Sequence, residues 1–326
     1  MLCINDHNTD PYFNLAAEEY VLKQFAKDSF MLWRNAPSVI VGRHQNSLAE
    51  INLDYVKQNQ IKVVRRLSGG GAVFHDLGNL NFTFIENAKS DNLIDFQKYT
   101  QPIIEVLQLL DIDARFEGRN DLVIDGKKFS GNAEHVYRDR VLHHGTLLFA
   151  SELADISGAL NVNPKKFTDK AVKSVRSRVT NISSHLKKPL DIEQFRDLIL
   201  NYMIDNYPDC EPYSYTDADI AAISRLRDEK YATWDWNFGQ SPGYNMVNEL
   251  KTAGGYIEAH LDVANGIIRN VRIFGDFFNI DDTAELEQFL IGTHHNETDI
   301  REKLKRINLS NYLINVTIDD MIKVLV

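Results

Sequence analysis

The residues best suited to chemistry begin with a glycine cluster that follows two arginines. The run Arg65–Asp76 reads RRLSGGGAVFHD and places Gly69, Gly70 and Gly71 in succession. Missing side chains let a backbone approach a ligand closely and aim its N–H groups at an anion. Arg66 could hold a phosphate or carboxylate with two parallel hydrogen bonds. The run is not a Walker A loop, and a plain glycine turn with solvated arginines is the alternative.

A second polar group surrounds Asp125-Gly126 within Gly118–Asn132. A two-residue hairpin turn there would pair Val123 with Lys128. Because successive strand residues point to opposite faces, we expect one polar face and one apolar face. The polar face would hold Asp121, Val123, Lys128 and Ser130, and the apolar face Leu122, Ile124, Lys127 and Phe129. This pattern selects Lys128 for a site, and an exposed hairpin tip is the alternative.

Two further features contain basic or metal-binding residue types. His143 and His144 lie in an expected strand, so they point to opposite faces and make a poor shared metal site. A partly buried structural histidine is the alternative reading. The stretch Pro164–Arg178 holds six lysines and arginines against the single acid Asp169. It could cover a phosphate-bearing ligand or meet an acidic partner, and a solvated loop is the alternative.

The elements that must position these residues do not alternate as strand–helix–strand units. The apolar spacing predicts helices at 13–27, 96–110, 192–207 and 217–228, and strands at 38–41, 61–64, 81–85, 121–124, 127–130 and 141–149. This order favours an α/β (α+β) fold with a mixed, largely antiparallel sheet and packed helices. We expect a catalytic domain over 1–246. A small α+β domain over 247–326 would contain a hairpin at Asn265-Gly266.

Composition excludes several classes of protein. The 326-residue chain carries a net charge of −10, which argues against a general nucleic-acid binder. No apolar run approaches the length of a membrane span, and no signal peptide is visible, so a cytoplasmic location is expected. The two cysteines, Cys3 and Cys210, predict neither a zinc ribbon nor a disulfide scaffold.

Together these motifs resemble the lipoate–protein ligase A family over nearly the whole chain. The runs that carry the resemblance, in order, are Arg65–Asn79 (RRLSGGGAVFHDLGN), Gly118–Val123 with Asp125–Asn132 (GRNDLV, DGKKFSGN), His143–Leu148 (HHGTLL), Ser174–Asn181 (SVRSRVTN) and Trp236–Gln240 (WNFGQ). Phe13–Glu19 and Leu32–Gly42 fit as well. Each run is weak alone, but five in one order are specific. The resemblance implies a catalytic domain like those of biotin–protein ligases and class II aminoacyl-tRNA synthetases.

The resemblance also implies a two-step reaction. Lipoate (lipoic acid) and MgATP would give lipoyl-AMP and pyrophosphate. The adenylate would then acylate a lysine on an apo lipoyl domain of a 2-oxoacid dehydrogenase E2 subunit, or on the glycine-cleavage H protein. ATP and lipoic acid are thus the implied substrates and Mg²⁺ the implied ion, and a monomer is expected. Neither nucleic acid nor membrane is an expected partner.

The same resemblance assigns roles to individual residues. The nucleotide would be bound by Arg66, Gly71, Ala72, Val73, Phe74, Lys128 and Arg178. Lipoate would be bound by Gly70, Gly71, His75, Lys128 and His144. Lys128 is the expected catalytic residue, holding the lipoyl carboxyl and the phosphate without being acylated. Asp121 is the expected Mg²⁺ ligand, because hard cations prefer carboxylates.

Three other functions remain alternatives. An octanoyl or lipoyl transferase of the same fold uses a cysteine nucleophile, and neither Cys3 nor Cys210 lies near a site motif in the sequence. A biotin ligase usually carries a Gly-Arg-Gly-Arg loop, where this chain has Ser-Gly-Gly-Gly-Ala. A non-catalytic sensor or scaffold would not need Arg66 and Lys128 together with the glycine run.

Overall fold

A computed structural model describes residues 1–87, 94–153, 158–160, 179–207, 209–238, 246–264 and 266–326. Its larger part contains an eight-stranded sheet. The strands are Leu2–Asn5 (β1), Ser29–Trp33 (β2), Asn79–Asn87 (β6), Ala114–Glu117 (β7), Asp121–Ile124 (β8), Lys127–Tyr137 (β9), Arg140–Leu148 (β10) and Glu211–Tyr213 (β11). Their order is β11-β1-β2-β6-β10-β9-β8-β7. The pairs β11–β1 and β1–β2 are parallel and the others antiparallel, which confirms the mixed, largely antiparallel sheet.

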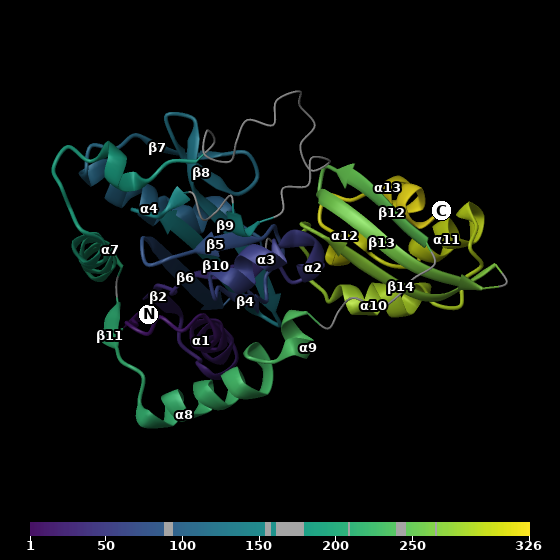
Figure 1. Cartoon of the computed structure of the whole chain (residues 1–326), viewed down its shortest axis with the longest axis horizontal. Coiled ribbons are helices and arrows are strands. Elements are labelled where there is room, and N and C mark those ends of the chain that lie inside the picture. Colours follow the sequence, from purple (N-terminus) through teal and green to yellow (C-terminus); the bar gives the residue numbers. More distant parts are fainter. Residues whose placement is uncertain (88–93, 154–157, 161–178, 208, 239–245, 265) are drawn as a thin grey trace.

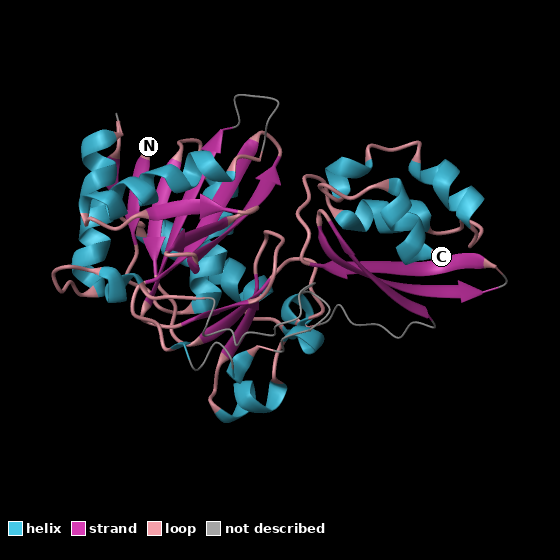
Figure 2. Cartoon of the chain, turned by 90° about the horizontal axis from the view of Figure 1, so that it is seen from above, coloured by secondary structure: helices cyan, strands magenta, loops and turns pink. Residues whose placement is uncertain are grey.

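Helices cover both faces of this sheet (Figures 1 and 2). Strand β2 shows why, because it contributes to an apolar core on each face. Phe30 and Leu32 pack in the core with α4 (Phe96–Leu109) and α7 (Ile192–Asn206). Met31 and Trp33 pack in the core on the other face, with α1 (Pro11–Gln24) and α8 (Asp217–Leu226). A strand buried on both sides favours a continuous apolar run, and β2 (SFMLW) is apolar at every position after Ser29. Helix α1 begins where Asp10 caps its first turn and Pro11 supplies a preset φ.

A second, three-stranded sheet lies on the α1 side of the eight-stranded sheet and contributes to the apolar core on that side. It consists of Ser38–Val41 (β3), Lys62–Arg65 (β4) and Val73–His75 (β5) in the order β4-β3-β5. Ile40 and Val64 of this sheet pack against Leu15 of α1 and Trp33 of β2. Short helices complete this part of the chain: Ser47–Glu50 (α2), Leu53–Gln58 (α3), Ile182–His185 (η2), Arg227–Tyr231 (η3) and Trp234–Asn237 (α9).

The C-terminal part has a sheet and a core of its own (Figure 1). Strands Met246–Thr252 (β12), Gly255–Ala264 (β13) and Ile267–Gly275 (β14) form an antiparallel sheet. Helices Thr283–Leu290 (α10), Glu297–Leu304 (α11), Leu309–Tyr312 (α12) and Ile318–Leu325 (α13) pack on it. The small α+β unit is confirmed. Residue 265 of the expected hairpin turn lies outside the described residues, and Gly266 has the positive φ of 70° that such a turn needs.

The two cysteines are paired with each other, which the sequence did not predict. Cys3 on β1 and Cys210 beside β11 form a disulfide, with their Cα atoms 6.2 Å apart. Nothing in their sequence context predicts this pairing, because it depends on the parallel contact of β1 with β11. Three strands separate β1 from β9, which carries Lys128, so Cys3 lies roughly 19 Å from that lysine at the usual strand spacing. Within the described chain, no helix is long and apolar enough to cross a membrane.

Glu19 fastens α1 to the segment that follows α8. It is 3% exposed and accepts hydrogen bonds from Lys23, Lys230 and Tyr231. Burial alone would raise the pKa of Glu19, but the charge of Lys230 and these hydrogen bonds outweigh it and lower the pKa to about 2. A depressed folded-state pKa stabilises the protein above pH 4.5, and this stabilisation is lost as the pH falls toward 2.

The first prediction concerns this acid. Glu19→Gln leaves Lys230 without its counterion and should lower the free energy of unfolding at pH 7 by about 3 kcal/mol. The difference from wild type should shrink as the pH falls from 4.5 to 3, measured by urea unfolding. Glu302→Gln, which removes an exposed ion pair with Lys305, should leave the free energy of unfolding nearly unchanged. A Glu19 effect that does not vary with pH would contradict the assigned pKa.

Candidate active site

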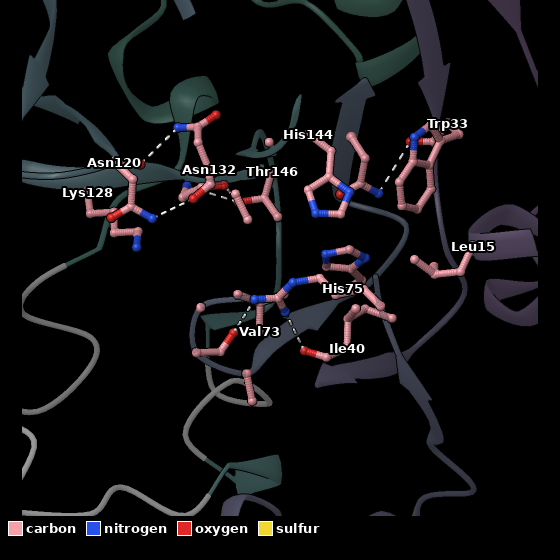
Figure 3. A pocket seen from close by; sticks show the side chains of 18 residues that line it. Leu15, Trp33, Ile40, Val73, His75, Asn120, Lys128, Asn132, His144 and Thr146 are labelled. Carbon is pink, nitrogen blue, oxygen red and sulfur yellow. Dashed lines mark hydrogen bonds between the residues drawn. The ribbon is translucent and has the colours of Figure 1, made fainter. Parts of the chain in front are cut away.

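One pocket lies between the two sheets of the larger part, and Figure 3 shows its lining. It leaves about 630 Å³ free of protein atoms. Its polar end is lined by Lys128 and Asn132 of β9 and by Asn120 of the turn between β7 and β8, and its other end by apolar side chains. The lining residues are Leu15, Trp33, Ile40, Arg66, Gly70, Gly71, Ala72, Val73, His75, Asn81, Asn120, Lys128, Gly131, Asn132, Ala133, His144, Gly145 and Thr146. Most of the residues selected from the sequence therefore meet in one place.

Lys128 lies at the polar end, as its position on the hairpin predicts. Asp125 and Gly126 both have positive φ (51° and 70°), and Val123 pairs with Lys128, which confirms the two-residue turn. Lys128 Nζ is 2.7 Å from Asp121 Oδ1, and both side chains are more than one third exposed. A Cβ at Gly131 would lie 2.8 Å from Nζ, so this glycine makes room for the lysine.

The expected place of Ser130 on the polar face is wrong. The register shifts by one residue between Leu122 and Val123, so Leu122 pairs with Ser130 and Asp121 with Gly131. An extra residue in one strand turns the following side chains to the other face. Ser130 is 1% exposed and accepts a hydrogen bond from Asn132. The polar end is completed by Asn132 and Asn120 instead.

The three glycines of the cluster differ in their conformation and surroundings. A Cβ on Gly69 would lie 2.2 Å from the carbonyl oxygen of Phe277 in the C-terminal part. Gly70 has a φ of 87°, which side chains rarely allow, and its N–H also faces the Phe277 carbonyl at 3.3 Å. Gly71 has open space where a Cβ would be, and it lines the pocket. Only part of the cluster therefore serves close approach of a ligand.

Both arginines before the cluster are buried, so the alternative of solvated side chains is wrong. Arg65 donates to the carbonyl oxygens of Gly42, Arg43 and Gln45 and holds the turn after β3. Arg66 is 5% exposed, and burial lowers its pKa to about 10, which leaves it charged.

The two parallel bonds expected from Arg66 to a ligand are not available in this conformation. Its guanidinium donates to Ser68 Oγ (3.0 Å), Ile40 O (3.2 Å), Gly69 O (2.5 Å) and Gly71 O (2.9 Å). These bonds use four of the five N–H donors of an arginine. Arg66 thus holds the glycine loop in shape and presents its charge to the pocket with one donor left.

The neighbouring histidines do point to opposite faces. His144 lines the pocket, with Nδ1 2.9 Å from Glu18 Oε1 and Nε2 2.6 Å from Ser68 Oγ. His143 lies on the α4 side, where Nδ1 contacts Glu134 at 2.9 Å. Burial raises the pKa of Glu134 to about 8 and lowers that of His143, so their buried contact forms without a strong ion pair. His143 is the structural member of the two.

His75 lies beside His144 and toward the apolar end of the pocket (Figure 3). Its ring centroid is 6.1 Å from that of Trp33, and Nδ1 meets the Asn35 amide at 3.1 Å. Burial, followed by the charge of Arg66 and by His144, lowers the pKa of His75 to about 3. The ring is therefore neutral and suits an apolar neighbour.

Three predicted residues are not in the lining, and one of them is Asp121, although it pairs with Lys128. Phe74 packs in the core behind the small sheet and can offer only its backbone. Arg178 lies outside the described residues, although the next residue, Val179, pairs with Lys128 through an isolated bridge. The sequence did not single out Trp33, Asn120, Asn132 and Thr146. All four fall within the motif runs, but only the folded chain shows that they line the pocket.

The pocket can hold a molecule that is anionic at one end and apolar at the other. Lys128 provides a cation beside the Asn120 amide, while Leu15, Trp33, Ile40 and Val73 provide the apolar wall (Figure 3). Arg66 and the Gly71 backbone lie alongside as a place for a second anion. In the described chain no three carboxylates, histidines or cysteines gather as a metal cluster.

The glycine cluster supplies the second prediction. Gly69→Ala places a methyl group against the Phe277 carbonyl and should lower the melting temperature by several degrees. Gly71→Ala meets no neighbour and should melt like the wild type, while its methyl group hinders ligand approach and weakens ATP binding. Calorimetry and thermal unfolding of the two variants would check this. Equal loss of stability in both would contradict the separate roles.

Comparison with known proteins agrees with this geometry. The family model of the lipoyl protein ligase A/B catalytic domain matches residues 10–204, and that of the bacterial lipoate protein ligase C-terminus matches residues 241–325. The chain is 42% identical to lipoate-protein ligase LplJ of Bacillus subtilis, with 99% of each chain covered. It is 43% identical to lipoate–protein ligase 1 of Staphylococcus aureus, with 98% of each covered.

Solved structures give the same result. The crystal structure of Plasmodium falciparum LipL1 in complex with lipoate matches with a TM-score of 0.80 and 27% identity, covering 94% of each chain. A lipoate-protein ligase A bound with ATP matches with a TM-score of 0.64 and 27% identity, covering 73% of this chain and 98% of that one. The chain belongs to the lipoate–protein ligase family of enzymes.

Proposed function

We propose that this chain uses ATP to convert free lipoate into lipoyl-AMP and then transfers the lipoyl group to a lysine of an acceptor protein. The observation that carries the proposal is the two-ended pocket, with Lys128 at the polar end and Leu15 and Trp33 at the apolar end. Its length and polarity suit an acid with a long apolar tail. Full-length similarity to lipoate–protein ligases supports the same substrate.

Lys128 is the catalytic residue of this proposal. The lipoate carboxylate attacks the α-phosphorus of ATP, the bond to the β-phosphate oxygen breaks, and pyrophosphate leaves. Negative charge develops on the phosphate oxygens, and a fixed cation beside them lowers the barrier. The ammonium of Lys128 holds both the carboxyl and the phosphate, so the two reacting groups stay close. The acceptor lysine then attacks the mixed anhydride, an amide forms, and AMP leaves.

We assign the nucleotide to the loop beside Lys128. The proposal places the phosphates against the charge of Arg66 and the backbone of Gly71, Ala72, Val73 and Phe74. Arg178 belongs to the same site, and its support is the contact of the following residue, Val179, with Lys128. The lipoyl chain lies along Gly70, Gly71, His75 and His144, all of which line the pocket.

Asp121 is the proposed ligand of Mg²⁺. A single carboxylate fits this role, because Mg²⁺ in nucleotide sites is held by one or two carboxylates together with phosphates and water. When bound, Mg²⁺ neutralises phosphate charge. Asp121 now pairs with Lys128 at 2.7 Å, so an Asp121 oxygen engaged by a cation would leave the Lys128 ammonium free for the substrates.

The acceptors we propose are apo lipoyl domains of 2-oxoacid dehydrogenase E2 subunits and the glycine-cleavage H protein. An archaeal bi-partite lipoate protein ligase with its E2 lipoyl domain matches this chain with a TM-score of 0.65 and 30% identity. We also propose a cytoplasmic monomer with a catalytic domain over 1–246 and an accessory domain over 247–326. The start of β12 at Met246 supports that division.

A cysteine-dependent acyl transferase is not supported. Cys3 is 2% exposed, is joined to Cys210, and lies on β1, which three intervening strands separate from the strand that carries Lys128. A nucleophile at that position cannot reach an acyl group in the pocket.

The third prediction separates the two adjacent lysines. Lys128→Ala should reduce lipoate adenylation by about 10²- to 10³-fold, because it removes a fixed cation from the transition state. Lys127→Ala should change the rate by less than about threefold, since Lys127 is exposed and does not line the pocket. Pyrophosphate release gives the rate. Similar rates in the two variants would refute the assignment of faces.

The overall activity is tested with an apo lipoyl domain. The domain is incubated with the chain, ATP and free lipoate, and its intact mass is measured. A mass increase of one lipoyl group on a single lysine is expected, and it should require ATP. Modification without ATP would point to an acyl transferase, and no modification of any acceptor would contradict the transfer step.

A further inference from the structure

A buried carboxylate lies directly behind the pocket, where two chains of hydrogen-bonded side chains meet. Glu18 of α1 is 2% exposed and does not itself line the pocket. Its Oε1 atom is 2.9 Å from His144 Nδ1 and 2.6 Å from Thr83 Oγ1. An ionised carboxylate only accepts hydrogen bonds, so both neighbours must donate to it. This fact sets the direction of every bond further along the two chains.

The first chain leads to the nucleotide loop. His144 donates from Nδ1 to Glu18, so Nε2 of the neutral ring accepts from the hydroxyl of Ser68 at 2.6 Å. Ser68 Oγ in turn accepts from Nε of Arg66 at 3.0 Å, because a guanidinium only donates. Every donor and acceptor is thereby matched. The chain joins a buried cation to a buried anion through two neutral side chains.

The second chain leads to the apolar end of the pocket. The indole N–H of Trp33 can only donate, and it meets Thr83 Oγ1 at 2.9 Å. The Thr83 hydroxyl is then free to donate to Glu18. Thr83 is fully buried and Trp33 is 3% exposed, so neither side chain can exchange its partner for bulk water. The orientation of Trp33 in the pocket wall therefore depends on the same carboxylate.

We propose that Glu18 is a positioning residue for both ends of the pocket. Through His144 and Ser68 it fixes the orientation of Arg66, and through Thr83 it fixes that of Trp33. This inference rests on the proposed function, since it takes the Arg66 end as the nucleotide site and the Trp33 end as the site of the acyl tail. Glu18 thus sets nucleotide and acid binding together without touching either ligand.

The neighbouring acid provides a matched control. Glu19 follows Glu18 in α1 and is equally buried, at 3% exposed. Its partners are Lys23, Lys230 and Tyr231, none of which lines the pocket. Both acids lose a charge and keep their shape when replaced by glutamine. A general loosening of α1 should follow from either change, whereas a loss of orientation in the pocket should follow only from Glu18→Gln.

The experiment measures the dissociation constants of ATP and of lipoate by calorimetry for four variants. Glu18→Gln should weaken both ligands by about threefold to tenfold, the range of one hydrogen bond. Ser68→Ala breaks the first chain and should weaken ATP by a similar factor, with lipoate within about twofold of wild type. Thr83→Val keeps the side-chain shape, breaks the second chain and should weaken lipoate alone. Glu19→Gln should leave both constants within about twofold.

Thermal unfolding reports whether each variant is folded. If Glu18→Gln does not fold, the double variant Ser68→Ala/Thr83→Val interrupts both chains with Glu18 in place and should weaken both ligands. The inference is overturned if Glu18→Gln binds both ligands normally, if the two single variants affect the same ligand, or if Glu19→Gln matches Glu18→Gln. Binding by the wild type without adenylate formation would contradict the proposed function alone.

Discussion

The buried guanidinium of Arg66 is the constraint on which the site depends. Taking a cation out of water is costly unless its donors are satisfied. Arg66 meets this requirement with the carbonyl oxygens of Ile40, Gly69 and Gly71 and with the Ser68 hydroxyl. Those bonds give the glycine loop a fixed shape and hold β3 beside the start of β5. The small sheet packs on the large one through apolar side chains, with Ile40 and Val64 against Leu15 of α1 and Trp33 of β2.

The two cations of the pocket, Arg66 and Lys128, differ in burial. Arg66 is buried, and acceptors of the protein itself engage most of its N–H donors. It therefore contributes a positive charge to the pocket but can form few further hydrogen bonds with a ligand. Lys128 is more than one third exposed, and among the described residues its ammonium pairs with the similarly exposed Asp121, so a ligand can replace that pair at small cost. This difference explains how one site can be both rigid and open to substrates. In the proposed function, the exposed cation mainly binds the substrates and the buried one mainly holds the shape of the site.

Much of this arrangement could be predicted from local signals. The Asp-Gly turn, the pairing of Val123 with Lys128 and the opposite faces of His143 and His144 follow from strand geometry, and all are observed. The limits of α4 and α7 lie within one residue of the predicted helices. These features depend on neighbours that are close in the sequence.

Other features depend on contacts between distant segments, and they were missed or misplaced. The bulge that moves Ser130 to the core side has no local marker. The disulfide joins Cys3 and Cys210, which lie 207 positions apart in the sequence. The need for glycine at position 69 comes from Phe277 in the C-terminal part. Glu18 is an acid within an otherwise apolar helix face, which is a visible irregularity, but its partners on β6 and β10 become known only in three dimensions.

The central claim is that one pocket brings the lipoate carboxylate against the α-phosphate of ATP. Lipoate-dependent exchange of radiolabelled pyrophosphate into ATP, without any acceptor protein, tests it most directly, because exchange requires reversible formation of lipoyl-AMP. Our account predicts exchange that needs lipoate and is lost in Lys128→Ala but kept in Lys127→Ala. A wild-type chain that binds ATP and lipoate yet gives no lipoate-dependent exchange would contradict it.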